Sequence, residues 1–199
     1  MGWNGGMPRL VRFADRHPEP WANGLGSTVE IARDPAATPF DWRLSVARID
    51  ADAPFSLLPG IDRALMALEA DPLRLRVSDE LRILNQHDVL VFPGEAAVTP
   101  SGIVHPGHDL NLMTRRGRIE GILEVLRVDG EAIITVTGEG RAVAVVLEGG
   151  LRLRVSDGAG SEIPLTRLDA AVGGAGEGLH LIGTGLLAVA RVARATAAG

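Results

Sequence analysis

The heptapeptide Leu-Arg-Leu-Arg-Val-Ser-Asp occupies residues 73–79, and the same seven residues recur at 151–157. The 78-residue offset continues upstream without a gap, so that residues 53–79 match residues 131–157 at ten of 27 positions. The additional identities place Gly60 over Gly138, Arg63 over Arg141 and Ala64 over Ala142. This match predicts a tandem duplication, and an internal repeat decides the architecture before any local pattern does.

The repeated segment has the period of a β-strand. Leu73, Leu75 and Val77 alternate with polar residues, which places one row of side chains on a core, and Ser-Asp then favours a turn. No segment shows a long apolar helical period, whereas the chain contains 25 Gly and 12 Pro, as short strands joined by turns require. We therefore expect an all-β fold.

Three parts follow from the repeat. We expect a first barrel at 40–117 and a second barrel at 118–199, with the boundary at Arg115-Arg116-Gly117. Residues 1–39 have no counterpart in the second repeat, so this segment is expected to cap one barrel or to add a strand to the other. The predicted strands are 42–49, 63–69, 73–77, 81–84, 88–92, 109–114, 119–128, 131–137, 141–147, 151–155, 163–168, 179–183 and 186–193.

Composition excludes several functions. A net charge of −5 argues against nucleic-acid binding, which requires a basic face. All 20 basic residues are Arg, so no lysine is present for Schiff-base or P-loop chemistry, and the absence of Cys removes disulfides and thiol nucleophiles. No apolar stretch is long enough for a membrane span, and a cytoplasmic location fits these features.

Four segments resemble the signature blocks of the HutD/Ves family in order and spacing: PWANGLGSTVEIAR (20–33), FDWRLSVARI (40–49), PFSLLPGIDRALMALE (54–69) and DLNLMTRRG (109–117). The wider pattern resembles the double-stranded β-barrel of the cupins, here as a bicupin of jelly-roll type. The resemblance implies a link to histidine utilisation, and it suggests an N-formylglutamate-like ligand.

Most enzymatic cupins bind a divalent metal through His and Glu side chains. In the matching places of the first repeat this sequence has Ser56, Leu58 and Arg63, and the later His is replaced by Ala97 or Val98. The second repeat offers Ile134, Val136 and Arg141 at the first three places. We expect neither a metal nor another cofactor. His105 and His108 retain metal-like spacing, but we interpret them as a polar loop tip, because two His seldom hold a metal without a third ligand.

An arginine inside a barrel suggests an anion site, because the guanidinium is a planar fork of donors suited to a carboxylate. Alternation on neighbouring strands can bring further polar side chains to Arg63. The candidate ligand-binding residues are Arg63, Ser56, Arg43, Ser45, Asn111, Asp109, Trp42 and Asn23. Other interpretations remain open: Arg63 could pair with Asp62 or Asp109, Trp42 could be a packing residue, and Asn23 could form a turn.

We therefore expect a metal-free bicupin that binds a small carboxylate metabolite in the first barrel as a sensor or modulator, with a structural second barrel. No catalytic apparatus is visible. The alternatives are a metal-independent isomerase or hydrolase with Asp109 or Asp62 as base, and a protein-interaction module. The sequence does not fix the oligomeric state, and a homodimer is one option.

Overall fold

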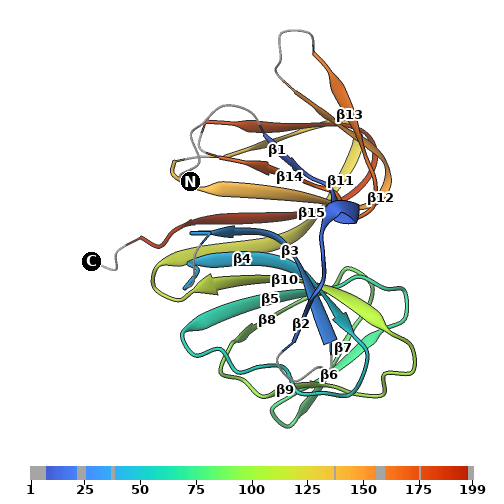
Figure 1. Cartoon of the computed structure of the whole chain (residues 1–199), viewed down its shortest axis with the longest axis vertical. Helices are drawn as coiled ribbons and strands as arrows, with labels where there is room; N and C mark the ends of the chain where they lie inside the picture. Colours follow the sequence, from blue (N-terminus) through green and yellow to red (C-terminus); the bar gives the residue numbers. More distant parts are fainter. Residues whose placement is uncertain are drawn as a thin grey trace. The chain divides into compact units, whose positions relative to one another are not determined.

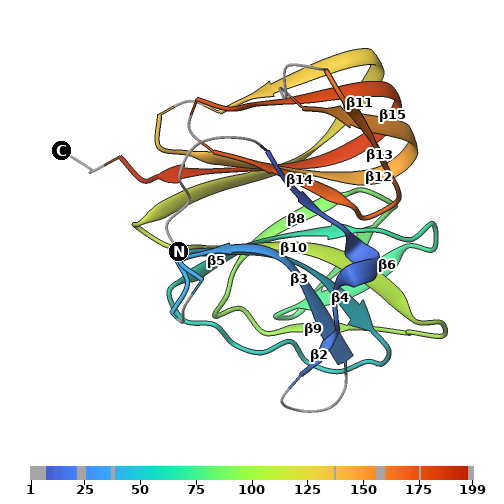
Figure 2. The ribbon, with the colours of Figure 1, turned by 45° about the horizontal axis from the view of Figure 1, so that its top comes forward.

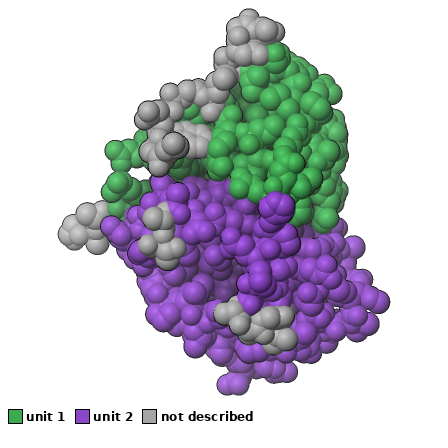
Figure 3. Space-filling view, viewed as in Figure 1, with its two compact units in different colours: residues 1–16, 119–199 green, residues 17–118 purple. Residues whose placement is uncertain are grey.

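The computed structural model describes residues 8–21, 26–36, 39–136, 138–155, 160–174 and 176–196. These form an all-β structure with one short 3-10 helix, which confirms the all-β part of the predicted fold class (Figure 1). The chain divides into two compact units (Figure 3): unit 1 contains residues 1–16 and 119–199, and unit 2 contains residues 17–118. Among the described residues, no helix is long and apolar enough to cross a membrane.

Unit 2 contains two sheets. A six-stranded sheet has the order β2-β3-β4-β10-β5-β8, and a three-stranded sheet has the order β7-β6-β9. The strands are β2 (Glu19–Pro20), β3 (Gly26–Asp34), β4 (Trp42–Ile49), β5 (Ile61–Ala67), β6 (Leu73–Val77), β7 (Glu80–Leu84), β8 (Val89–Pro93), β9 (Val98–Pro100) and β10 (Gly107–Arg115).

Unit 1 contains one sheet with the order β1-β14-β12-β15-β11, to which β13 adds by pairing with β12. Its elements are β1 (Arg9–Val11), the 3-10 helix η1 (Phe13–Asp15), β11 (Ile119–Thr135), β12 (Arg141–Arg154), β13 (Glu162–Leu165), β14 (Ala170–Gly173) and β15 (Gly178–Arg194). None of the three sheets closes on itself in the described residues, so the two closed barrels expected from the sequence are replaced by open sheets.

Strands of the N-terminal segment pair with strands of both units. β1 pairs with β14 of unit 1, and the two strands run side by side in Figures 1 and 2. β2 and β3 instead extend the unit 2 sheet beyond β4. Asp169 ties the first part down: its buried carboxylate accepts hydrogen bonds from Arg12 at 2.7 Å and from the backbone N–H of Phe13 at 2.9 Å.

Three strands of unit 1 are longer than expected, because predicted breaks are bends inside continuous strands. β11, β12 and β15 each join two predicted strands, and the bends contain Gly130, Gly149 and Gly183, which all have positive φ. β12 and β15 approach closely at the bend that contains Gly149, which we call the glycine corner. There a Cβ on Gly185 would lie 2.3 Å from the backbone oxygen of Glu148. Glycine permits both the bend and this contact, so the ladder continues where a turn was predicted.

The repeated heptapeptides lie on strands that pack leucines into their cores. Leu75 of β6 belongs to the unit 2 core, with Leu73 packed against it, and Leu151 and Leu153 of β12 belong to the unit 1 core. The strand orders also correspond: β4, β10, β5 and β8 follow one another in unit 2 as β11, β15, β12 and β14 do in unit 1. The last two residues of the second copy, 156–157, lie outside the described residues.

The gapless offset nevertheless misplaces Arg141. Ala142 belongs to the core of unit 1, whereas Arg141 donates hydrogen bonds to the backbone oxygens of Glu139 and Gly140 in its own turn. The register of β12 on β15 shifts between Val146 and Glu148, and a one-residue bulge exchanges the two faces of a strand. Ala142, rather than Arg141, therefore takes the inward position that Arg63 has in unit 2.

The close approach at the glycine corner generates a prediction. Gly185→Ala should lower the free energy of unfolding by about 3 kcal/mol, the upper end of the usual cost of overpacking, because the new Cβ meets rigid backbone. Gly150→Ala, where a Cβ would have nothing within 4 Å, should change it by less than about 0.5 kcal/mol. Urea unfolding measures both values, and equal destabilisation by the two variants would contradict this account of the corner.

Candidate ligand pocket

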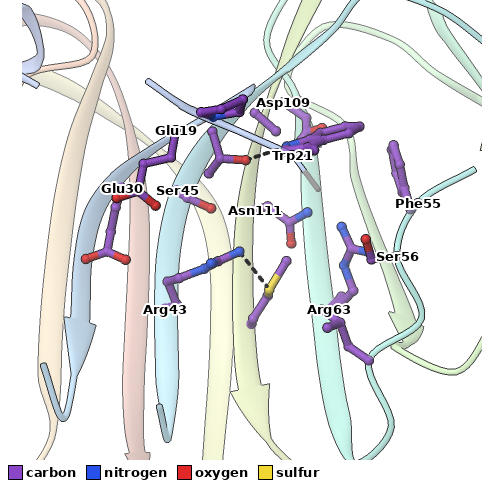
Figure 4. A pocket seen from close by; sticks show the side chains of 15 residues that line it. Glu19, Trp21, Glu30, Arg43, Ser45, Phe55, Ser56, Arg63, Asp109 and Asn111 are labelled. Carbon is purple, nitrogen blue, oxygen red and sulfur yellow. Dashed lines mark hydrogen bonds between the residues drawn. The ribbon is translucent and has the colours of Figure 1, made fainter. Parts of the chain in front are cut away.

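Unit 2 contains a cavity of about 240 Å³ against the inner face of its larger sheet. The strands that build it are neighbours, with β10 at the centre between β4 and β5. The lining residues are Glu19, Pro20, Trp21, Thr28, Glu30, Arg43, Ser45, Ala47, Phe55, Ser56, Leu58, Arg63, Asp109, Asn111 and Met113 (Figure 4).

The strand register arranges the pocket as three rungs. Met113 lies opposite both Arg43 and Arg63, which places the two arginines on the same rung. Asn111 forms the middle rung with Ser45, and Asp109 forms the third, opposite Ala47. Because alternate residues of a strand share a face, the sequence delivers all of these side chains to one side of the sheet.

Six buried polar atoms of this pocket lack hydrogen-bond partners inside the protein. The buried side-chain atoms without a hydrogen bond are Arg43 Nε, Arg63 Nε, Ser45 Oγ, Asn111 Oδ1 and both carboxyl oxygens of Asp109. All five residues line the cavity, and the set includes every atom of this kind found among the described residues. Buried polar groups are normally paired, so a cluster of unpaired ones facing a cavity is a place where a ligand or water supplies the partners.

Arg63 is held by aromatic rings rather than by an acid. Its guanidinium carbon lies 5.1 Å from the ring centroid of Phe55 and 5.0 Å from that of Phe92, within the range of cation–π contacts. Burial lowers its pKa to about 10, although the charge of Asp109 acts in the opposite direction. The side chain remains charged at neutral pH, and only 6% of the residue is exposed. The rings fix its position and leave its donors available.

Arg43 approaches from the opposite strand. Its guanidinium carbon lies 5.4 Å from the ring centroid of Phe40, and Nη2 contacts the sulfur of Met113 at 3.6 Å. Burial lowers the pKa of Arg43, while the nearby carboxylate of Glu30 raises it. Glu30 is itself paired with Arg33 at 2.7 Å, so it does not neutralise Arg43 through a direct contact.

Asp109 is the acidic group of the pocket, and 1% of the residue is exposed. Burial raises its pKa to about 7, with smaller opposing effects from the charge of Arg63 and the amide of Asn111. No direct hydrogen bond reaches either carboxyl oxygen. Asp109 lies four residues along β10 from Met113, about 13 Å of extended strand, which accounts for the lack of an ion pair with Arg63.

Trp21 and Phe55 form an aromatic wall. Their rings make an edge contact with centroids 6.2 Å apart, and Trp21 Nε1 donates a hydrogen bond to Thr28 Oγ1 at 2.7 Å. Trp21 also packs over Gly26, where a Cβ would lie 2.8 Å from the indole ring. Figure 4 shows Asp109 near Trp21, with Asn111 between the side chains of Arg43 and Arg63.

The structure brings together six of the eight predicted site residues, which are Arg63, Ser56, Arg43, Ser45, Asn111 and Asp109. Trp42 is a correction: it is buried and does not line the pocket, because it lies one residue from Arg43 and therefore on the opposite face of β4. Asn23 lies outside the described residues. Asp62, an alternative catalytic base, forms an ion pair with Arg116 at 2.7 Å and does not line the pocket.

Several pocket residues were missed from the sequence as ligand contacts. They are Glu19, Thr28 and Glu30 from the N-terminal strands, Trp21 and Phe55 of the wall, and Met113 of β10. Met113 shares the alternation of Asp109 and Asn111, which was a usable signal. The contribution of β2 and β3 could not be recognised, because these strands lie in the segment without a counterpart in the repeat.

The histidine pair lies elsewhere. His105 and His108 line a second cavity of about 280 Å³ in unit 2, where His108 Nδ1 is 2.8 Å from Glu69 Oε1. Across the part of the chain that the structure describes, no group of three or more His, Cys, Asp or Glu could hold a metal ion. Ser56, Leu58 and Arg63, which stand in the sequence where cupins have metal ligands, line the first cavity.

Unit 1 differs at the corresponding ladder positions. With Val189 placed over Asn111 by the 78-residue offset, β11 and β12 present Glu124 and Ala144 opposite Val189. Leu187 and Ala142 replace Asp109 and Arg63, and both belong to the apolar core. The full set of polar side chains found in the unit 2 pocket is therefore absent at these described positions of unit 1.

Comparisons with known proteins agree with this architecture. Protein Ves from Citrobacter koseri is 34% identical over 138 residues, which cover 67% of this chain and 69% of that protein. The solved structure of HutD from Pseudomonas fluorescens SBW25 has a TM-score of 0.79 at 26% identity, covering 96% of this chain and all of the other. A cupin 2 conserved barrel domain protein from Leptotrichia buccalis shares the fold, with a TM-score of 0.58 at 11% identity over 94% of this chain and 96% of that one.

The model of the HutD family matches residues 13–189, a span that includes the pocket and most strands of both units. The expected family is thereby confirmed, and the chain belongs to the HutD family, whose relatives include protein Ves.

Proposed function

We propose that unit 2 binds a small carboxylate metabolite between Arg43, Arg63 and Asp109, and that the protein acts as a sensor or modulator linked to histidine utilisation. The observation that carries the proposal is the cluster of six unpaired buried polar atoms around one cavity. Two fixed positive charges at one end of the cavity favour an anion, and a guanidinium pairs well with a carboxylate. A volume of about 240 Å³ favours a small ligand.

The unpaired atoms specify more than a carboxylate. Arg43 and Arg63 require acceptors, whereas Asp109 and Asn111 Oδ1 require donors. A ligand that satisfies both must carry acceptor oxygens, as a carboxylate does, together with a donor such as an N–H group. N-formylglutamate, the ligand suggested by the family resemblance, has two carboxylates and one amide N–H, so its chemistry fits this requirement.

A second candidate function is metal-independent catalysis with Asp109 as general acid or base. A buried carboxyl with a pKa of about 7 is suited to proton transfer near neutral pH. If NMR detected a product formed from the ligand by the wild type but not by Asp109→Asn, the protein would be an enzyme rather than a binding protein. The interaction-module alternative has less support, because a closed apolar interior would favour it, whereas this cavity is lined by charged and polar side chains as well as apolar ones.

We also infer that the two units are diverged copies of one cupin half, with the ligand site retained in unit 2. The repeated heptapeptide and the corresponding strand orders support this inference. The apolar Ala142 and Leu187 in unit 1 support a structural role for the second copy.

Arg63→Met tests the anion site. It keeps the apolar stem but removes the charged donors, and loss of a charge-assisted hydrogen bond should cost about 1.5–3 kcal/mol, roughly tenfold to a hundredfold in affinity. Isothermal titration calorimetry with N-formylglutamate measures the change. Arg141→Met is the matched control: the Arg141 side chain donates hydrogen bonds to its own turn and belongs to unit 1, so this variant should bind with the affinity of the wild type. Equal losses in both folded variants would refute the assignment.

The donor requirement is tested by comparing ligands. Glutarate has the same two carboxylates as N-formylglutamate but no N–H group, so Asp109 and Asn111 would lose one hydrogen bond. We expect glutarate to bind more weakly by about 0.5–1.5 kcal/mol, roughly twofold to tenfold, in the same calorimetric assay. Equal affinities would show that the N–H group makes no useful contact with these acceptors.

A further inference from the structure

The pocket contains an unequal number of positive and negative groups. Arg43 enters from β4, Arg63 from β5 and Asp109 from β10, and all three side chains face the same cavity. With Asp109 ionised, these groups sum to one positive charge. A monocarboxylate would bring the total to zero, whereas a dicarboxylate would leave one uncompensated negative charge beside the buried Asp109, which is costly.

The other charged groups that face the cavity do not remove this imbalance. Glu30 on β3 is paired with Arg33, so this pair adds no net charge. Glu19 on β2 lines the cavity but is an exposed residue, so water screens its charge. From β10 and β4, Asn111 and Ser45 contribute only neutral polar groups, as does Ser56 from the segment before β5.

We propose that Asp109 takes up one proton when the pocket binds a dianionic carboxylate, so that binding of dianions, but not of monoanions, weakens as pH rises. The proposal rests on the proposed function and adds a mode of regulation to the same site. No bond of the ligand breaks: one proton moves from solvent to a carboxyl oxygen of Asp109.

The geometry suits this change. Neither oxygen of Asp109 accepts a direct hydrogen bond from the described side chains, and 1% of the residue is exposed, so the protein stabilises the ionised form only weakly. A protonated carboxyl gains an O–H donor for a ligand carboxylate, and its other oxygen still accepts from an N–H group. The protonated form therefore makes bonds with both kinds of ligand group.

The pH range follows from the pKa of Asp109, which burial raises to about 7 before any ligand binds. An anionic ligand beside the carboxyl raises this pKa further. Below pH 7 the free protein already carries the proton, so affinity for a dianion stays constant. Above pH 7 the proton must be acquired during binding, and affinity falls about tenfold for each pH unit.

Calorimetry in buffers of different ionisation enthalpy, such as HEPES and Tris at pH 8, measures the protons taken up. With N-formylglutamate we expect close to one proton per site, and with formate, a monoanion, close to none. Asp109→Asn should bind N-formylglutamate without proton uptake and with an affinity that changes little between pH 6 and 8.5. Asp62→Asn is the matched control: Asp62 lies outside the pocket, and the uptake should equal that of the wild type.

The outcomes separate this inference from the proposed function. Binding of N-formylglutamate without proton uptake would overturn the inference and leave the carboxylate site standing. If proton uptake persisted in Asp109→Asn, another group would be taking up the proton, and this result would also overturn the inference. Absence of binding at every pH would overturn the proposed function, and the proton coupling with it. If Asp109→Asn did not fold, carboxyl NMR of the wild type would decide: a titration near pH 7 must move upward when N-formylglutamate binds.

Discussion

The pocket depends on charged side chains that have buried polar atoms without hydrogen-bond partners in the protein. Arg43, Arg63 and Asp109 lie within one cavity, yet the strand register keeps Asp109 two rungs away from the arginines. A direct ion pair would satisfy these groups and close the site. Because the register separates Asp109 from the arginines, no ion pair forms, and the protein retains unpaired polar atoms. A ligand that forms hydrogen bonds with these atoms is stabilised by them.

Two other features maintain this arrangement. Phe55 and Phe92 hold the guanidinium of Arg63 through ring contacts, so its position requires no acidic partner. β10 lies between β4 and β5, and its alternate residues reach the same side of the sheet. The site is therefore built on paired strands rather than on loops, which keeps the distances between its groups fixed.

Much of unit 2 could be predicted from the sequence, because the alternation of Arg43 with Ser45 and of Asp109 with Asn111 reports directly which face of a strand each occupies. The errors have physical causes. Trp42 was assigned to the site although a neighbouring strand residue points to the opposite face. The ungapped match aligns Arg141 with Arg63, because the sequence does not reveal the one-residue bulge that turns the side chains of β12 to the opposite face. Strand breaks were predicted at glycines that only bend the chain, as at Gly149.

The central claim is that a ligand carrying both carboxylate and N–H groups supplies the partners that these side chains lack. A crystal structure of the chain with N-formylglutamate tests it most directly. We predict carboxylate oxygens of the ligand within hydrogen-bond distance of Arg43 and Arg63, and its amide N–H directed to Asp109 or Asn111. Ligand bound only in the second cavity beside His108, or a pocket whose polar atoms are paired with water alone at saturating ligand, would contradict the account.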